Sequence, residues 1–160
     1  FNMYPDLGEK VKILENTVRL AHAFGVEKPK VAVLAAVEVV NPDMPCTLDA
    51  AAIAQMNRRG QIKGCIVDGP FALDNAISEE SAAHKGIVSE VAGKADILLV
   101  PDIDAGNMMA KAIVYMTNNK TAGLVLGAKA PVVLTSRSDS AETKLLSIAS
   151  AVALAAYKGN

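Results

Sequence analysis

The segment KVAVLAAV, residues 30–37, is an apolar run rich in small and β-branched side chains, and Glu38 ends it. Apolar runs without polar alternation are typical of parallel strands that are buried on both faces of a sheet. Shorter runs of the same kind occur at residues 65–67 and 97–100. The sequence therefore predicts a buried and mostly parallel sheet.

Segments with helical spacing separate these runs. Apolar residues recur every three or four positions in residues 6–24, and Gly25 follows as a stop signal. Further helices are predicted at 47–60 (with Thr47 as the cap), from near Phe71, at 106–117 and at 139–157, whereas the polar residues 78–93 receive no element. Strands that alternate with helices predict an α/β fold, a three-layer α/β/α Rossmann-like sheet with helices on both faces.

Two short apolar runs, residues 124–126 and 132–135, are separated by Gly127-Ala128-Lys129-Ala130-Pro131. This spacing suits a tight reversal, so we predict an antiparallel pair at an edge of the otherwise parallel sheet.

Composition limits the class of protein. The chain has 160 residues, a formal net charge of −1 and 51% hydrophobic residues, which suits one folded domain. No basic excess marks a nucleic-acid partner, and no apolar run is long enough to cross a membrane. Cys46 and Cys65 are too few for a disulfide framework, so both are predicted to be reduced thiols of a cytoplasmic protein.

Polar residues follow three of the predicted strands, where ligands of α/β sheets gather. They are Asp68-Gly69-Pro70, interpreted as a turn, the segment 101–107, and the segment 135–140. The third segment places hydroxyl groups and Arg137 just before a helix, where free N–H groups and a guanidinium favour an anion such as phosphate. Asp139 with Glu142 also fits an ordinary capping box, and the two interpretations are compatible.

Other chemistry has weaker support. The segment 101–107 fails as a calcium loop because Ile113 stands where a bidentate Glu is needed, which leaves a magnesium site at Asp102 and Asp104 as an open alternative. His22 and His84 lack metal-ligand spacing, and neither cysteine has an adjacent histidine.

The chain resembles the phosphate acetyl/butyryltransferase family, and its phosphate butyryltransferase branch in particular. The resemblance covers essentially the whole chain and is carried by ordered motifs, which are Asn41-Pro42-Asp43-Met44-Pro45, Thr47-Leu48-Asp49-Ala50-Ala51, Gly60-Gln61-Ile62-Lys63-Gly64, Val67-Asp68-Gly69-Pro70, Ala72-Leu73-Asp74, His84-Lys85-Gly86, Val91-Ala92-Gly93-Lys94-Ala95-Asp96-Ile97, Pro101-Asp102-Ile103, Ala105-Gly106-Asn107 and the run from Gly127 to Arg137.

The resemblance implies a reversible reaction of a short-chain acyl-CoA with phosphate to give acyl phosphate and CoA, without a metal ion or redox cofactor. Ser136 and Arg137 match the family's active-site pair, in which the arginine holds phosphate or CoA and the serine hydrogen-bonds the thioester or thiolate. Thr143 stands where the acetyl branch has an acidic residue, which makes the neighbouring Glu142 the candidate base. The remaining candidate substrate-binding residues are Asn107, Asp68, Gly69, Thr135 and Ser138.

The family also implies two α/β domains of isocitrate/isopropylmalate dehydrogenase-like architecture, about twice the length of this chain, and a homodimer. The start at Phe1 without an initiator Met then suggests a piece of a longer protein, inactive alone. Residues 1–138 are predicted to form the second domain, and the helix within 139–160 to pack on the missing first domain. Two alternatives remain, which are a non-catalytic acyl-CoA-sensing domain and a metal-dependent dehydrogenase of similar architecture.

Overall fold

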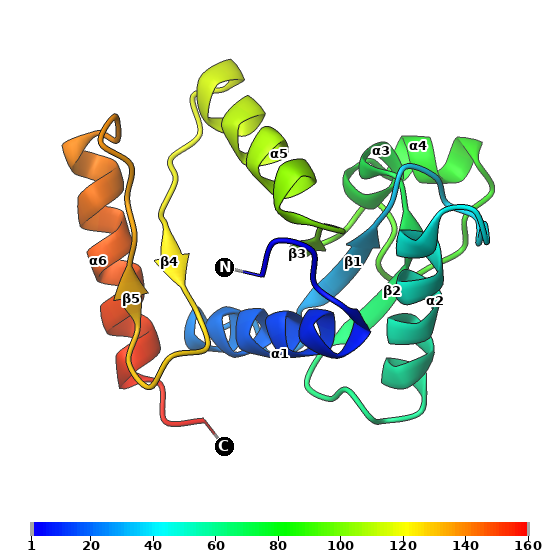
Figure 1. Cartoon of the computed structure of the whole chain (residues 1–160), viewed down its shortest axis with the longest axis horizontal. Helices are drawn as coiled ribbons and strands as arrows, with labels where there is room; N and C mark the ends of the chain where they lie inside the picture. The colour runs from blue at the N-terminus through cyan, green and yellow to red at the C-terminus, as the bar shows by residue number, and fades with distance from the viewer. Residues whose placement is uncertain (1, 160) are drawn as a thin grey trace.

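The computed structural model describes residues 2–159, which form a parallel sheet in the order β2-β1-β3 and a separate pair, β4-β5 (Figure 1). None of the helices in this range combines the length and apolarity needed to cross a membrane. The elements, in chain order, are α1 (Leu7–Ala23), β1 (Lys30–Leu34), α2 (Pro45–Arg58), β2 (Ile66–Phe71), α3 (Leu73–Ile77), α4 (Glu79–His84), β3 (Ile97–Leu99), α5 (Ile103–Met116), β4 (Leu124–Val125), β5 (Val132–Val133) and α6 (Ala141–Ala156).

The central strand β1 is buried on both faces, as its unbroken apolar run predicts. Val31 and Val33 belong to a core cluster that includes residues of α1 and α2. Ala32 and Leu34, which point the other way, belong to a second cluster that includes residues of α3 and α4. The predicted α/β fold with helices on both faces of a parallel sheet is confirmed, and β1, β2 and β3 all end at one edge of that sheet.

The first helix, α1, lies within one residue of its predicted ends. The Asp6 side chain accepts a hydrogen bond from the Glu9 backbone N–H at 2.8 Å, and the Glu9 carboxylate accepts one from the Asp6 N–H at 3.0 Å. This reciprocal pair is a capping box, which satisfies two otherwise free N–H groups. A partly buried ion pair of 2.6 Å between Lys10 and Asp49 then links α1 to α2.

The second strand, β2, continues through the segment that the sequence interprets as a turn. Asp68, Gly69 and Pro70 all lie inside β2, and the Gly69–Pro70 peptide bond is cis. The pairing with β1 shifts register between Ala32 and Leu34 opposite this segment. The predicted turn is therefore wrong, because an irregular parallel pairing accommodates a glycine and a proline that otherwise signal a chain reversal.

The predicted cap of α2 is also wrong. The helix begins at Pro45, and Thr47 lies inside its first turn. The fully buried Thr47 hydroxyl accepts from the Asn41 N–H, and its single proton lies within reach of the carbonyl oxygens of Met44 at 2.8 Å and Asn41 at 3.0 Å. Thr47 therefore closes the preceding loop, and proline, which needs no N–H partner, takes the first helical position.

The polar stretch at residues 78–93 contains a short helix, α4, that the sequence leaves unassigned. Ser78 caps this helix through a hydrogen bond from the Ser81 N–H at 3.2 Å. Beyond the helix, Val91 and Ala92 are buried in the cluster on the α3–α4 face of the sheet. A mostly polar segment is therefore held against the sheet by a few buried apolar residues, Ala82 of α4 and Val91 with Ala92.

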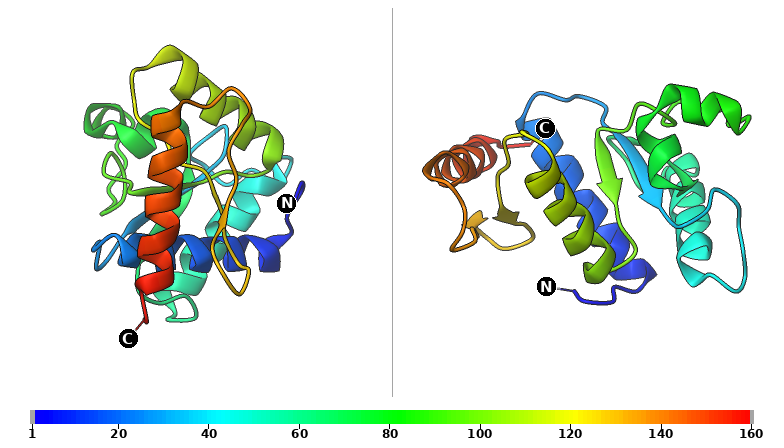
Figure 2. Two further views of the ribbon diagram at one scale, coloured as in Figure 1. Left: turned by 90° about the vertical axis from the view of Figure 1, so that its left-hand side faces the viewer. Right: turned by 90° about the horizontal axis from the view of Figure 1, so that it is seen from above.

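The pair β4-β5 is antiparallel, as predicted, but it forms its own two-stranded sheet and does not extend the edge of the parallel sheet. Gly123, just before β4, lies so close to the residue after β5 that a Cβ would collide with the Leu134 carbonyl oxygen. Figure 2 shows this pair beside α6 and apart from the parallel sheet.

The last helix, α6, packs against β4, β5 and α1. The Ser147 hydroxyl, which is fully buried, accepts from the Gly123 N–H at 2.9 Å and donates to the Thr143 carbonyl at 2.7 Å. On another face of α6, Leu145, Ile148 and Val152 are 66%, 53% and 62% exposed. The domain boundary at residue 138 stays a prediction.

Candidate functional site

The loop between β5 and α6, residues 135–140, is held by its own polar side chains. The Asp139 carboxylate accepts from the Ser136 N–H at 2.6 Å, and the Ser136 and Ser138 hydroxyl oxygens lie 3.1 Å apart. The predicted capping box of Asp139 and Glu142 is wrong, since Ser140 is the N-cap of α6 and accepts from the Thr143 N–H. Asp139 instead stabilises the loop conformation by accepting the hydrogen bond from the Ser136 N–H.

Arg137 projects from this loop and is exposed to solvent. Its guanidinium forms no ion pair or side-chain hydrogen bond within residues 2–159. A planar fork of N–H donors that neighbouring carboxylates leave free is suited to bind an oxyanion. The position and exposure of Arg137 are therefore compatible with the predicted contact to phosphate or CoA.

One face of α5 lies opposite the loop and completes the candidate site. Asn107, Lys111 and Tyr115 follow one another at the i, i+4 spacing that places side chains on one face of a helix. All three line a small cavity of about 110 Å³ together with Asp139. The Tyr115 hydroxyl lies 3.5 Å from the Ser138 hydroxyl, and the Lys111 ammonium lies 5.8 Å from the centre of the Tyr115 ring.

The structure thus places Asn107 in one cavity with Asp139 of the loop, and Ser138 approaches the same helix through Tyr115. The binding roles of Asn107, Thr135, Ser136 and Ser138 stay predictions. The structure also adds Lys111, Tyr115 and Asp139, which the sequence analysis does not select for binding. The sequence does contain one indication of Lys111 and Tyr115, because both follow Asn107 at four-residue spacing and so share its helix face.

Glu142, the candidate base, forms an ion pair with Lys120. The Lys120 ammonium lies 2.6 Å from a carboxylate oxygen of Glu142, and this contact raises the pKa of Lys120. Both side chains are largely exposed. The role of Glu142 as a base stays a prediction.

Asp68 and Gly69 lie at the other side of the sheet, on the strand β2. The Asp68 carboxylate accepts from Arg58 at 3.2 Å and lines an open cavity with basic side chains that include Lys63 and Lys94. Within residues 2–159, none of the cavities found contains both Asp68 and Asn107. The expected contribution of Asp68 and Gly69 to the same site as α5 and the 135–140 loop stays a prediction.

The two aspartates considered for magnesium have structural partners. Asp102 is the N-cap of α5 and accepts from the Ala105 N–H at 2.9 Å, and the Tyr4 hydroxyl donates to Asp104 at 3.1 Å. Hydrogen bonding to Asp104 raises the pKa of Tyr4. In the described part of the chain, no three His, Cys, Asp or Glu side chains are grouped so that they could hold a metal ion.

The two cysteines and His22 show no feature of a catalytic or metal-binding site in the described residues. Both cysteines are free, and burial, followed by the charge of Glu15, raises the pKa of the Cys65 thiol to about 11. Such a thiol is a poor nucleophile at neutral pH. His22 lies 2.8 Å from the Gly64 carbonyl oxygen through its Nε2 atom.

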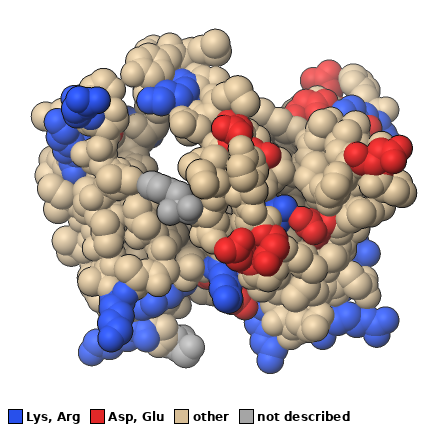
Figure 3. Space-filling view, viewed as in Figure 1, with Lys and Arg blue, Asp and Glu red and all other residues tan. Residues whose placement is uncertain are grey.

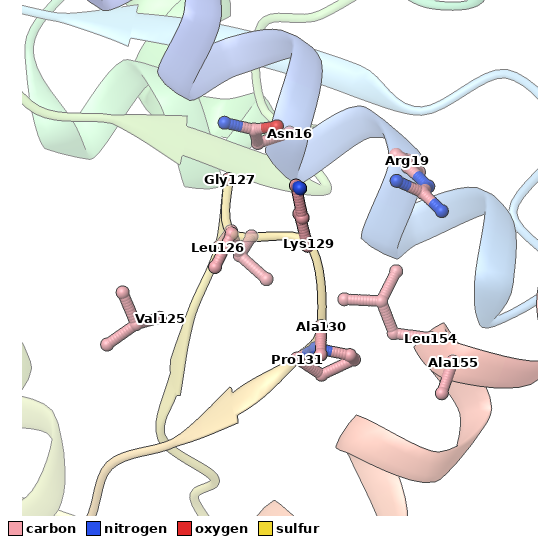
Figure 4. Close-up of a pocket in the computed structure, with 11 residues that line it drawn as sticks. Asn16, Arg19, Val125, Leu126, Gly127, Lys129, Ala130, Pro131, Leu154 and Ala155 are labelled. Atoms are coloured by element: carbon pink, nitrogen blue, oxygen red, sulfur yellow. The ribbon is translucent and has the colours of Figure 1, made fainter.

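A further cavity of about 280 Å³ lies between α1, α6 and the turn that joins β4 to β5 (Figure 4). Asn16 and Arg19 of α1 and Lys129 of the turn contribute polar atoms to its wall, while Leu126 and Leu154 contribute apolar surface. Gly127 has φ +92°, and a Cβ there would lie 2.9 Å from the Asn16 amide nitrogen. The turn therefore needs glycine where it approaches α1.

Charge is distributed unevenly along the chain. Residues 105–160 contain six Lys or Arg residues and only two acidic residues, Asp139 and Glu142. The whole chain, in contrast, contains 16 Lys or Arg and 17 Asp or Glu. Figure 3 shows the acidic side chains gathered over the right-hand part, which holds the sheet, while basic side chains dominate the part around α6. An excess of cations over residues 105–160 favours an anionic ligand on this part of the chain.

The fold and site define an α/β domain that has helices on both faces of a parallel sheet and a serine–arginine loop near the polar face of α5. The chain belongs to the phosphate acetyl/butaryl transferase family, whose model matches residues 1–153. The resemblance drawn from the sequence motifs is thereby confirmed.

Similar proteins include phosphate butyryltransferase from Clostridium acetobutylicum, 60% identical over 99% of this chain and 52% of that protein. Phosphate acetyltransferase from Thermotoga maritima is 61% identical over 91% of this chain and 49% of that protein. A crystal structure of a branched-chain phosphotransacylase from Enterococcus faecalis V583 superposes with a TM-score of 0.88 at 38% identity, over 98% of this chain and 56% of the other. The chain spans about half the length of the curated relatives that it matches.

Proposed function

We propose that this chain forms the carboxyl-terminal half of an acyltransferase that converts a short-chain, butyryl-like acyl-CoA and phosphate reversibly to acyl phosphate and CoA. The observation that carries the proposal is the loop with Ser136 and Arg137, which faces the polar side chains of α5 in a member of this family. The relatives named above are described as transferases or transacylases, which favours catalysis over the sensing alternative.

In the proposed reaction, a phosphate oxygen attacks the carbonyl carbon of the thioester. The new C–O bond forms as the C–S bond breaks, and the proton lost by phosphate leaves with the CoA thiolate as its thiol. Negative charge builds up on the carbonyl oxygen and then on the sulfur, so positioned hydrogen-bond donors and cations lower the barrier. Holding two bound substrates in line supplies a further part of the rate.

We assign these tasks to groups of the candidate site. Arg137, with its free guanidinium, binds phosphate or the phosphates of CoA, and the Ser136 hydroxyl donates to the reacting thioester or the leaving thiolate. Thr135, Ser138 and Asn107 contact the substrates from the loop and from α5, and Asp68 with Gly69 contacts them from β2. Glu142 is the proposed base for the phosphate proton.

The substitution Arg137→Ala tests this assignment in a protein of full family length. We expect kcat/KM for phosphate to fall by about two orders of magnitude, because removing a group that stabilises developing charge typically costs that much. CoA release from butyryl-CoA, followed with a thiol reagent at varied phosphate concentration, measures the effect.

Arg59→Ala is the matched control, since Arg59 is an exposed arginine just beyond α2 and away from the site. It should leave the phosphate dependence unchanged. Equal kinetics in Arg137→Ala and Arg59→Ala would remove Arg137 from the site, and no CoA release from any acyl-CoA in the unsubstituted protein would refute the proposed activity.

The proposal extends to the whole protein. We infer a cytoplasmic homodimer that needs no metal ion or redox cofactor, whose substrates are acyl-CoA or CoA and inorganic phosphate, with neither a nucleic acid nor a membrane as a partner. Because the chain spans half of its relatives, we also propose that the other half is needed to complete the site and that residues 1–160 alone have little activity.

A further inference from the structure

A mostly apolar cavity, different from those described above, adjoins the candidate site. It has a volume of about 450 Å³ and lies where the start of α1, the end of β3 and the start of α5 meet. Its apolar walls are formed by Pro5, Ile13, Leu99, Val100, Ile103 and Gly106. A volume of this size is in the range of small-molecule sites, roughly 300–1,000 Å³.

Few polar groups face this cavity, and some of these are already satisfied. Asp102 lines it, but its carboxylate is engaged in capping α5 through the Ala105 N–H. Asn2 and Asn107 are the other polar residues of the wall, and the Asn2 amide donates to Glu9 at 2.6 Å. The cavity therefore favours an uncharged, apolar group.

Asn107 connects this cavity to the one that Asp139 of the 135–140 loop lines. Its side chain lines the apolar cavity and also the smaller cavity that contains Lys111, Tyr115 and Asp139. A ligand with a polar reactive end at the 135–140 loop and a short apolar tail would place the two ends on opposite sides of Asn107. An acyl thioester has this form.

We infer that the apolar cavity binds the acyl chain of the substrate, and that Gly106 and Ile13 determine which chain length is accepted. The inference rests on the proposed acyl transfer and adds the location of the acyl group. Each buried methylene changes affinity about fourfold, so the cavity supplies about a 15-fold preference for butyryl over acetyl.

Gly106 is well placed to limit chain length. It lies within α5, at a backbone conformation open to any residue, and a Cβ there would lie 3.0 Å from the Cγ2 atom of Val100. Alanine therefore narrows the cavity without breaking the helix, in which alanine is the better helix former. Ile13, on α1, narrows the cavity from the opposite side when it is replaced by phenylalanine.

The test measures kcat/KM with acetyl-, butyryl- and hexanoyl-CoA for Gly106→Ala and Ile13→Phe in a protein of full family length. We expect the butyryl-to-acetyl ratio to fall about fourfold in Gly106→Ala and about 15-fold in Ile13→Phe. A ratio taken within one variant does not depend on how much of that variant is folded. Gly8→Ala, a helical glycine of α1 outside the cavity, is the matched control and should keep the original ratio.

Two failures are distinguishable. If both variants transfer acyl groups with an unchanged chain-length ratio, the acyl chain binds elsewhere and the cavity is filled by another part of the protein, which overturns this inference alone. If the unsubstituted protein releases no CoA from any of the three substrates, the proposed function itself is wrong, and this inference falls with it.

Discussion

At Gly69 the pairing of β2 with β1 leaves no room for a side chain, because a Cβ would lie 2.7 Å from the Val33 carbonyl oxygen. The obstacle is backbone of the central strand, which cannot move away as a flexible side chain would. We predict that Gly69→Ala lowers the free energy of unfolding by about 2 kcal/mol, a typical cost of overpacking. Urea unfolding followed by circular dichroism measures the change.

Gly8→Ala serves as the comparison, because its Cβ would meet only the Asp6 carboxylate at 3.4 Å, an ordinary contact. It should leave the free energy of unfolding unchanged or raise it by up to about 1 kcal/mol, because alanine is a better helix former than glycine. A Gly69→Ala protein as stable as Gly8→Ala would contradict the steric argument, and a loss of acyl transfer in such a protein would then come from the proposed contact of Gly69 with substrate.

Single residues of the site were predictable only where a local pattern marked them. Ser136 and Arg137 are evident because hydroxyls and an arginine precede a helix, and Asn107 because it follows a strand end. Asp139 was misassigned because the Asp-x-x-Glu pattern of a capping box also fits a loop in which Ser140 is the cap. Lys111 and Tyr115 reach the site only through the tertiary approach of α5 to the loop.

Ser147 connects two elements, since its buried hydroxyl joins α6 to the residue before β4. We predict that Ser147→Ala leaves the Gly123 N–H without its partner and destabilises the packing of β4-β5 on α6 by about 1–2 kcal/mol. Amide hydrogen exchange, which reports local opening, should become faster at Gly123 and along β4.

The control for this substitution is Ser150→Ala on the same helix, where no comparable hydrogen bond ties the side chain to β4. It should leave exchange at Gly123 unchanged. Uniformly faster exchange through both the parallel sheet and β4 in Ser147→Ala would contradict a local role, because it would show a loss of global stability.

Elements with strong apolar patterns were predicted well, and their mutual placement less so. The run at 30–37 predicts the position and the two-faced burial of β1, although the strand ends at Leu34, three residues before the run does. The antiparallel β4-β5 pair followed from turn spacing, but local spacing says nothing about which sheet it joins. The irregular pairing of β2 opposite Ala32–Leu34 has no local signal at all, and it overrode the turn predicted at Asp68-Gly69-Pro70.

Over the whole molecule, apolar surface remains exposed where the carboxyl-terminal elements lie apart from the sheet (Figure 2). Leu145, Ile148 and Val152 form one face of α6 at helical spacing. Val132 and Val133 of β5, which contacts α6, and Leu134 just beyond it add further exposed apolar side chains. Contiguous apolar surface of this kind marks an interface. Since the curated relatives are about twice as long, the half that they possess in addition is the expected cover.

We therefore predict that residues 1–160 alone self-associate through α6 and that the combined substitutions Leu145→Gln, Ile148→Gln and Val152→Gln yield a monomer. Sedimentation velocity over a concentration series measures both. The combined substitutions Val39→Gln, Val40→Gln and Leu48→Gln, which alter similarly exposed side chains away from α6, should leave the association unchanged. A monomer for the unsubstituted chain at every concentration would contradict self-association. Hydrogen exchange in α6 would then be compared between residues 1–160 and the protein of full family length. Slower exchange in the longer protein would show that the other half covers this face.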